Sequence, residues 1–250
     1  MAFIKLESVS VSFPVYNSSG RSIKNRIVSA ATGGQISARE HGGIVVEALR
    51  DLSLEIEHGD RVALIGHNGA GKTTLLRLLA GIYEPPVGTI TVEGRVAPLF
   101  DLALGLNMES TGYENIRLRG LVLGLSKKEI DARMEGIAEA SELGQFLEMP
   151  LRTYSAGMLA RLAFAVSIAI QSDILLLDEG IGAGDAAFMA KARQKIAKFV
   201  ESAGILVLAS HSDELVTTMC DKALLLEHGR IIAQGPVEEV LATYRAGMAG

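Results

Sequence analysis

The feature that most constrains this chain is a glycine-rich loop, Gly66–Thr73, which matches the pattern G-x-x-x-x-G-K-[ST] in full. It follows a short apolar run, Arg61–Ile65, and precedes a helical pattern over Thr74–Ala80, which is the context that this motif requires. Its glycines let backbone N–H groups point inward at phosphate oxygens, and the helix N-terminus adds a positive dipole. Because pattern and context agree, we interpret it as a phosphate-binding loop rather than a simple glycine-rich turn.

Two carboxylates are expected to complete this site. The apolar run Ile174–Leu177 ends in Asp178 and Glu179. Asp178 would hold Mg²⁺ through water, and Glu179 would accept a proton from the water that attacks the γ-phosphate. Such an ending is common by chance, but with the loop it predicts a P-loop NTPase. The loop residues expected to bind the nucleotide are Gly66, His67, Asn68, Gly69, Ala70, Gly71, Lys72, which reaches the phosphates, Thr73, which also binds Mg²⁺, and Thr74.

The fold class follows from how apolar runs alternate with helical stretches. Continuous apolar runs predict buried parallel strands, whereas alternating runs near the N-terminus predict a small antiparallel sheet. We therefore expect an α/β protein with a P-loop NTPase (RecA-like) core, a small antiparallel β subdomain and an inserted α-helical subdomain. One domain would span residues 1–250, with the helical subdomain at about 103–165. The pattern from Leu121 to Ala169 is nearly all helical, and Ser126 is expected to be the N-cap of a helix over Lys127–Leu143. The expected strands are 61–65, 174–178, 205–209 and 223–227 in the core, and 3–12, 49–57 and 89–93 in the small sheet.

Composition excludes several other classes of protein. The net charge of −5 gives nucleic-acid binding little support. The longest apolar runs are far shorter than the roughly 20 residues that span a bilayer, and the first residues do not resemble a signal peptide. The single cysteine, Cys220, excludes an internal disulfide and suits a reducing compartment. We therefore expect a cytoplasmic location.

Three further segments narrow the choice among P-loop NTPases. Tyr154-Ser155-Ala156-Gly157-Met158 precedes a helix, so Ser155 is either a plain N-cap or part of a phosphate-binding signature. His211 follows the expected strand 205–209, at an edge where ligands bind in such sheets, although a lone histidine is often structural. Asp185 lies in a glycine-rich segment after Glu179.

The order of these motifs, over nearly the whole chain, resembles that of an ABC transporter nucleotide-binding subunit. The resemblance implies ATP and Mg²⁺ as cofactors, Glu179 and His211 as catalytic residues, and a D-loop position for Asp185. It also implies that Tyr154, Ser155, Ala156 and Gly157 meet the γ-phosphate of ATP held by a second subunit. A head-to-tail homodimer would then work with integral-membrane permease subunits.

Within that family the chain is similar to ATPases that export bacterial polysaccharides such as O-antigen, capsule and teichoic acid. Its signature Tyr-Ser-Ala-Gly-Met is close to their Tyr-Ser-Ser-Gly-Met, and Gly184–Phe188 resembles their Val-Gly-Asp-Ala-x-Phe. The segment from Leu99 to Ile116 also resembles theirs and lacks the usual Q-loop glutamine. The resemblance implies that Asp101 takes that place near Mg²⁺, and it implies a peripheral location at the cytoplasmic face of the inner membrane.

Two features leave alternatives open. Either Phe13 or Tyr16 is expected to stack on adenine.

The Gly/Ser-rich insert at about 17–43 is longer than in most ABC ATPases. Its middle, Arg21–Ala31, has two interpretations: it contacts the permease or lipid headgroups, or it is a disordered insert. Some O-antigen ATPases continue into a carbohydrate-binding domain, which we do not expect here.

Three other functions compete with polysaccharide export. ABC proteins of DNA repair or chromosome structure contain long coiled coils, and this sequence has no sustained heptads. Ribosome-associated ABC proteins carry two ATPase domains, whereas this chain has one P-loop. An ABC exporter for a lipid, drug or peptide would use the same hydrolytic residues and remains the main alternative.

Overall fold

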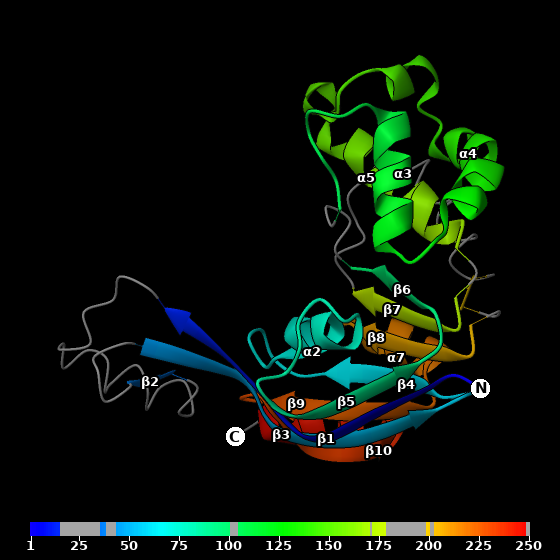
Figure 1. The fold of residues 1–250 in the computed structure, drawn as a ribbon. Coiled ribbons are helices and arrows are strands. Elements are labelled where there is room, and N and C mark those ends of the chain that lie inside the picture. Colours follow the sequence, from blue (N-terminus) through cyan, green and yellow to red (C-terminus); the bar gives the residue numbers. More distant parts are fainter. Residues whose placement is uncertain are drawn as a thin grey trace. The chain divides into compact units, whose positions relative to one another are not determined.

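The computed structural model describes residues 1–15, 36–38, 44–100, 105–170, 172–178, 199–200 and 203–248. The chain divides into two compact units (Figure 1). Unit 1 comprises Met1–Glu93 and Val207–Gly250, and unit 2 comprises Gly94–Leu206.

Unit 1 contains the expected antiparallel sheet. Its strand order is β2-β3-β1-β5, and β1 pairs antiparallel with both β3 and β5. The alternation seen in the sequence puts Ile4 and Leu6 of β1 in the core opposite Ile56 and Leu54 of β3. All three predicted strands are confirmed and extend beyond their predicted ends. Their bounds, with the additional β2, are β1 Phe3–Val15, β2 Ile36–Ala38, β3 Ile44–Glu57 and β5 Val87–Glu93.

The second set of strands in unit 1 carries the phosphate-binding loop. β4 (Arg61–Ile65) runs parallel to β9 (Lys222–Glu227), which pairs antiparallel with β10 (Arg230–Pro236). On its other side β4 neighbours β8 (Ile205–Ala209), whose last residues belong to unit 1. The predicted continuous strands are confirmed, and the side chains of β8 are buried throughout. The helices among the described residues of unit 1 are α2 (Lys72–Leu79), α7 (Asp213–Met219) and α8 (Val237–Met248).

Unit 2 pairs two parallel strands with a group of helices. The strands are β6 (Val96–Leu99) and β7 (Ile174–Asp178). The helices α3, α4 and α5 pack on one another around one apolar core (Figure 1). The helical segments are α3 Gly112–Val122, α4 Lys127–Ser141, η1 Gly144–Glu148, η2 Leu151–Thr153 and α5 Ala156–Ile168.

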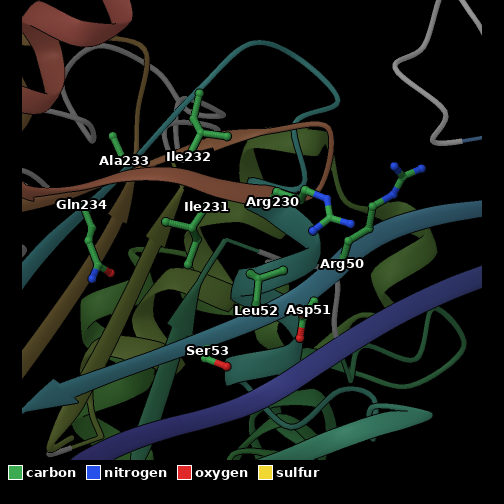
Figure 2. Close-up of a pocket in the computed structure, with 9 residues that line it drawn as sticks. All are labelled: Arg50, Asp51, Leu52, Ser53, Arg230, Ile231, Ile232, Ala233 and Gln234. Atoms are coloured by element: carbon green, nitrogen blue, oxygen red, sulfur yellow. The ribbon is translucent and has the colours of Figure 1, made fainter.

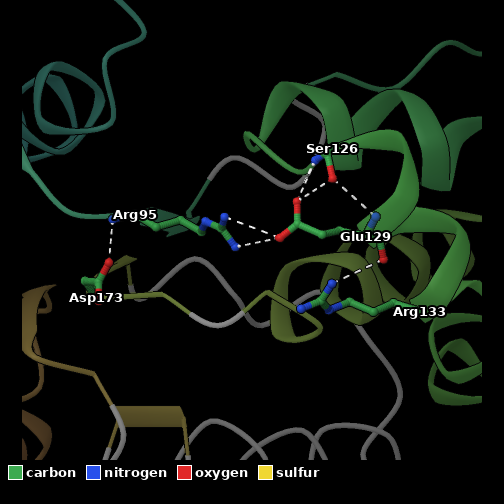
Figure 3. Close-up of polar contacts among 5 residues, drawn as sticks. All are labelled: Arg95, Ser126, Glu129, Arg133 and Asp173. Atoms are coloured by element: carbon green, nitrogen blue, oxygen red, sulfur yellow. Dashed lines mark hydrogen bonds and ion pairs between the residues drawn. The ribbon is translucent and has the colours of Figure 1, made fainter.

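The start of α4 lies at the predicted N-cap, Ser126, and the structure adds a capping box with Glu129. Ser126 is the N-cap, and Glu129 accepts from the Ser126 N–H at 2.8 Å (Figure 3). The helix ends at Ser141 rather than at the predicted residue 143, because Glu142 adopts a left-handed φ of 57°. None of the described helices is both long enough and apolar enough to cross a membrane.

Candidate functional site

The phosphate-binding loop joins β4 directly to α2, as predicted. Gly66 has a φ of 146°, and a Cβ there would lie 2.2 Å from the Leu226 carbonyl oxygen of β9. Only glycine lets the loop approach β9 this closely. The tight packing of Gly66 therefore sets the direction in which the loop leaves β4.

Lys72, the first residue of α2, is buried and turned back over the loop. Its Nζ donates to the Gly66 carbonyl and, at 3.1 Å, to the His67 carbonyl. The His67 Nδ1 lies 2.8 Å from the Asn68 carbonyl oxygen. The ammonium group is thereby held across the loop, where a phosphate would bind.

The N-terminus of α2 has the properties of an anion site. Gly71 is the N-cap, so no side chain caps this end among the described residues, and no acidic residue lies in the first turn. Thr73 is exposed and Thr74 is half-buried. Uncapped backbone N–H groups with the helix dipole fit phosphate oxygens, and the Thr73 hydroxyl is an oxygen ligand that suits Mg²⁺.

One of the two candidates for adenine stacking can be placed. Phe13 lies near the end of β1, is 38% exposed, and meets the ring of Tyr83 edge-on with centroids 5.6 Å apart. Tyr16 lies outside the described residues. The sequence reading missed Tyr83, because the contact joins residues far apart in the chain. Phe13 remains a prediction as the stacking residue.

The loop after β8 carries His211. Ser210 is buried and its hydroxyl accepts from the Ser212 N–H at 2.9 Å, while His211 itself is exposed. Because β8 neighbours β4, His211 and the phosphate-binding loop follow the ends of neighbouring strands. The predicted residues Asp101, Glu179 and Asp185, and the segment Arg21–Ala31, lie outside the described residues.

Unit 2 carries the remaining predicted residues that are described. Asp178 is the last residue of β7 and is half-buried, after four fully buried apolar residues. Ser155 is the N-cap of α5, and its hydroxyl accepts from the Met158 N–H at 3.2 Å. Ser155 is thus an N-cap in this structure. The N-terminus of α5 is exposed there, and its contact with a phosphate stays a prediction.

The signature segment borders a cavity of about 450 Å³. Ser155 and Gly157 line it together with Phe146, Met158 and Arg161, among others. Arg161 forms an ion pair with Glu142 at 3.8 Å, which ties α5 to the residue that ends α4. The signature segment therefore lies at the wall of an open cavity.

Tyr154 was predicted beside Ser155 as a nucleotide contact, and the structure places its side chain inward. It is 8% exposed, and its hydroxyl donates to the Phe146 carbonyl at 2.5 Å. Burial raises the pKa of this phenol. The side chain anchors the start of α5 in the core of unit 2, so any contact of residue 154 with a nucleotide would come from its backbone.

A different cavity, of about 480 Å³, lies between β3 and β10 in unit 1 (Figure 2). The guanidinium groups of Arg50 and Arg230 lie at one end and Gln234 lies at the other. Arg50 is paired with Glu47 at 3.0 Å, and Asp51 lines the same cavity. Its charges are therefore mixed, and it is distinct from the loop that is predicted to bind phosphate.

Comparisons with known proteins agree with this fold. The family model described as ABC transporter matches residues 49–182. A solved "ATP binding subunit of ABC transporter" superposes with a TM-score of 0.67 at 22% identity, covering 97% of this chain and 93% of that one. A dimeric post-hydrolysis structure of the ATP-binding cassette MJ0796, bound to ADP and Pi, gives 0.66 at 19% identity, covering 94% and 98%. These neighbours confirm the P-loop NTPase fold.

Relatives with higher sequence identity are ATP-binding proteins of polysaccharide export systems. The O-antigen export system ATP-binding protein RfbE of Yersinia enterocolitica is 44% identical over 92% of this chain and 97% of its own length. RfbB of Klebsiella pneumoniae is 40% identical over 98% of both. The teichoic acids export ATP-binding protein TagH of Bacillus cereus is 35% identical over 97% of this chain and 42% of its own length. With these matches and the motifs in place, the chain belongs to the ABC transporter family, whose ATPase domain binds ATP with Mg²⁺.

Proposed function

We propose that this chain is the ATP-hydrolysing subunit of an ABC transporter that exports a lipid-linked polysaccharide, such as O-antigen, through a separate permease. The observation that carries the proposal is an intact phosphate-binding loop in a chain similar, over nearly its whole length, to two O-antigen export ATP-binding proteins. The subunit would lie at the cytoplasmic face of the bacterial inner membrane. The proposed cargo is supported by similarity to these O-antigen export proteins, whereas the proposed ATP hydrolysis is supported by the residues of the loop.

The hydrolytic step needs residues from two subunits. Lys72 and the N-terminus of α2 would hold the β- and γ-phosphates, while Thr73 and Asp178 would hold Mg²⁺, which neutralises charge on the phosphate oxygens. Glu179 would accept a proton from the attacking water. The oxygen of that water would form a bond to the γ-phosphorus, and the bond from the γ-phosphorus to ADP would break, so that ADP leaves. Ser155 and Gly157 of the partner subunit would bind the γ-phosphate, assisted by His211 and Asp185. A head-to-tail dimer would thus close on ATP and open after hydrolysis.

A surface on α3 supports contact with a membrane partner. Leu118, Leu121 and Val122 lie at helical spacing and are 38%, 54% and 56% exposed. Large apolar side chains that gather on one exposed helix face commonly mark a protein interface. Motion would pass to the permease near this face and the segment from Asp101 to Asn115.

The hydrolytic part is tested with Glu179→Gln. The amide keeps the shape of the side chain but cannot accept the proton, so we expect Mg·ATP binding to remain while turnover falls by at least about a hundredfold. Light scattering should then detect an ATP-dependent dimer that persists. Turnover at the wild-type rate would remove Glu179 from the base role.

The transport part is tested by co-purification from bacterial membranes. A multi-span permease recovered together with a lipid-linked glycan would support polysaccharide export. A permease recovered with a lipid, drug or peptide cargo would favour the alternative exporter. A soluble partner alone would overturn the transporter reading.

A further inference from the structure

The turn between β9 and β10 holds a non-glycine residue, His228, at a positive φ. His228 has a φ of 46° and Gly229 a φ of 78°, so both central residues of this two-residue turn have positive φ. Such turns favour asparagine or aspartate followed by glycine, and histidine is among the few other residues that are enriched at positive φ. A residue with a Cβ still carries some backbone strain there, which contacts of its side chain can offset.

The His228 side chain meets the phosphate-binding loop. Its ring lies against that of His67, with centroids 5.2 Å apart and planes tilted by 59°. The Nδ1 atom of His228 is buried and has no hydrogen-bond partner among the described residues. The described contact of the His228 side chain is therefore the one with the His67 ring. The carbonyl of His67 accepts from the Lys72 ammonium group at 3.1 Å. A line of contacts therefore runs from His228 through His67 to Lys72.

The backbone of the same turn holds the loop at a second point. The Gly229 N–H donates to the Ala70 carbonyl at 3.0 Å, and the Gly229 carbonyl accepts from the Arg50 N–H at 2.7 Å. A Cβ at Gly229 would lie 2.7 Å from the Ala48 carbonyl oxygen. The turn is thus clamped between the phosphate-binding loop and β3, and its position does not depend on the His228 ring alone.

We propose that His228 is a positioning residue for nucleotide binding, which acts through His67 on the ammonium group of Lys72. This inference rests on the proposed function. A loop that is already ordered before the ligand arrives avoids the entropic cost of ordering on binding. The ring contact restricts His67, and the His67 carbonyl in turn restricts Lys72. Removal of the ring leaves the backbone clamp in place but lets Lys72 occupy more positions, so phosphate binding weakens.

The test is His228→Asn in the full chain. Asparagine suits this turn, so the hairpin should keep its geometry while the ring contact is lost. Isothermal titration calorimetry with Mg·ATP should show binding weakened about twofold to tenfold, the range that an aromatic pair supplies. The Tm without nucleotide should stay within about 2 °C of wild type. The control is His58→Asn in the His58-Gly59 turn, where His58 is exposed and only Gly59 has a positive φ; it should bind Mg·ATP as wild type does.

A double-mutant cycle separates this role from general packing. If His228 acts through His67, then His67→Asn combined with His228→Asn should weaken binding no more than the stronger single change. Additive losses would overturn the proposal, as would wild-type affinity in His228→Asn or a fall in affinity matched by a large fall in Tm. If the wild-type chain itself does not bind Mg·ATP, the proposed function fails and takes this inference with it.

Discussion

At the scale of single residues, backbone geometry limits the phosphate-binding loop as strongly as side-chain chemistry does. Gly66 packs against the Leu226 carbonyl and cannot carry a Cβ without displacing β9. Gly69 also has a positive φ, of 83°, but no described atom lies within 4 Å of a Cβ built there. The same substitution at the two glycines should therefore have different costs.

We expect Gly66→Ala to lower the free energy of unfolding by about 2–4 kcal/mol, because a backbone clash adds to conformational strain. Gly69→Ala should cost about 1–2 kcal/mol, which is the strain of positive φ alone. Urea denaturation followed by circular dichroism measures both. Equal losses would show that the contact with Leu226 does not limit the loop.

The single cysteine gives a second prediction for one residue. Burial and the nearby Asp221 carboxylate raise the pKa of the Cys220 thiol to about 12. Because the thiolate is the reactive form, Ellman's reagent at pH 8 should react slowly with the folded chain and rapidly in urea. The neutral thiol is favoured by the fold, so its contribution to stability is complete below the unfolded pKa of about 8.5 and is lost as the pH rises toward 12. Rapid labelling of the native protein would contradict this burial.

At the scale of elements, one carboxylate joins α4 to the segment that leads into β6. Glu129 Oε2 accepts from the Ser126 N–H and hydroxyl at 2.8 Å and 2.7 Å, while its Oε1 accepts from Arg95 at 3.4 Å (Figure 3). The Arg95 N–H in turn donates to Asp173 at 2.8 Å. The capping box therefore also contributes to the link between the helices of unit 2 and its two strands.

We expect Ser126→Ala to destabilise the chain by about 1 kcal/mol, because α4 loses the hydroxyl that caps its first turn. Glu129→Ala should lower the free energy of unfolding further, because it removes both the capping box and the contact with Arg95. Lys128→Ala, on the exposed face of the same helix, is the control and should stay within about 0.5 kcal/mol of wild type. Chemical denaturation ranks the three; a loss for Lys128→Ala as large as for Ser126→Ala would contradict a capping effect.

At the scale of the whole molecule, the proposed site is shared between two copies of the chain. The phosphate-binding loop and the signature serine would act on one ATP only when they come from different subunits. A variant damaged in the loop and a variant damaged in the signature should therefore complement each other, because a mixed dimer contains one intact pair.

We expect Lys72→Ala and Ser155→Arg each to abolish ATP hydrolysis when assayed alone. An equimolar mixture should regain measurable turnover, because the loop of the Ser155→Arg subunit faces the signature of the Lys72→Ala subunit. Steady-state phosphate release measures the recovery, with each variant at the doubled concentration as the control. A mixture as inactive as its components would contradict the shared site.

Much of the fold and part of the site could be predicted from local patterns. The phosphate-binding loop, the buried strand before it and the Ser126 cap depend on residues close together in the chain, and each lies where predicted. The start of α3 was missed, although Thr111 and Glu114 form a capping box that the same rule identifies. The end of α4 was placed two residues late, because the left-handed turn at Glu142 uses a residue that rarely signals one.

The phosphate-binding loop was predictable from local sequence, since a loop motif and its flanking strand and helix are features that periodicity and residue type encode. Which side chains lie around the loop and the signature segment depends instead on tertiary packing. It turned Tyr154 into the core, paired Phe13 with Tyr83, and brought His228 against His67. The two ring contacts join residues separated by long stretches of chain, and the burial of Tyr154 depends on helices that pack around it, so no local pattern contains these contacts.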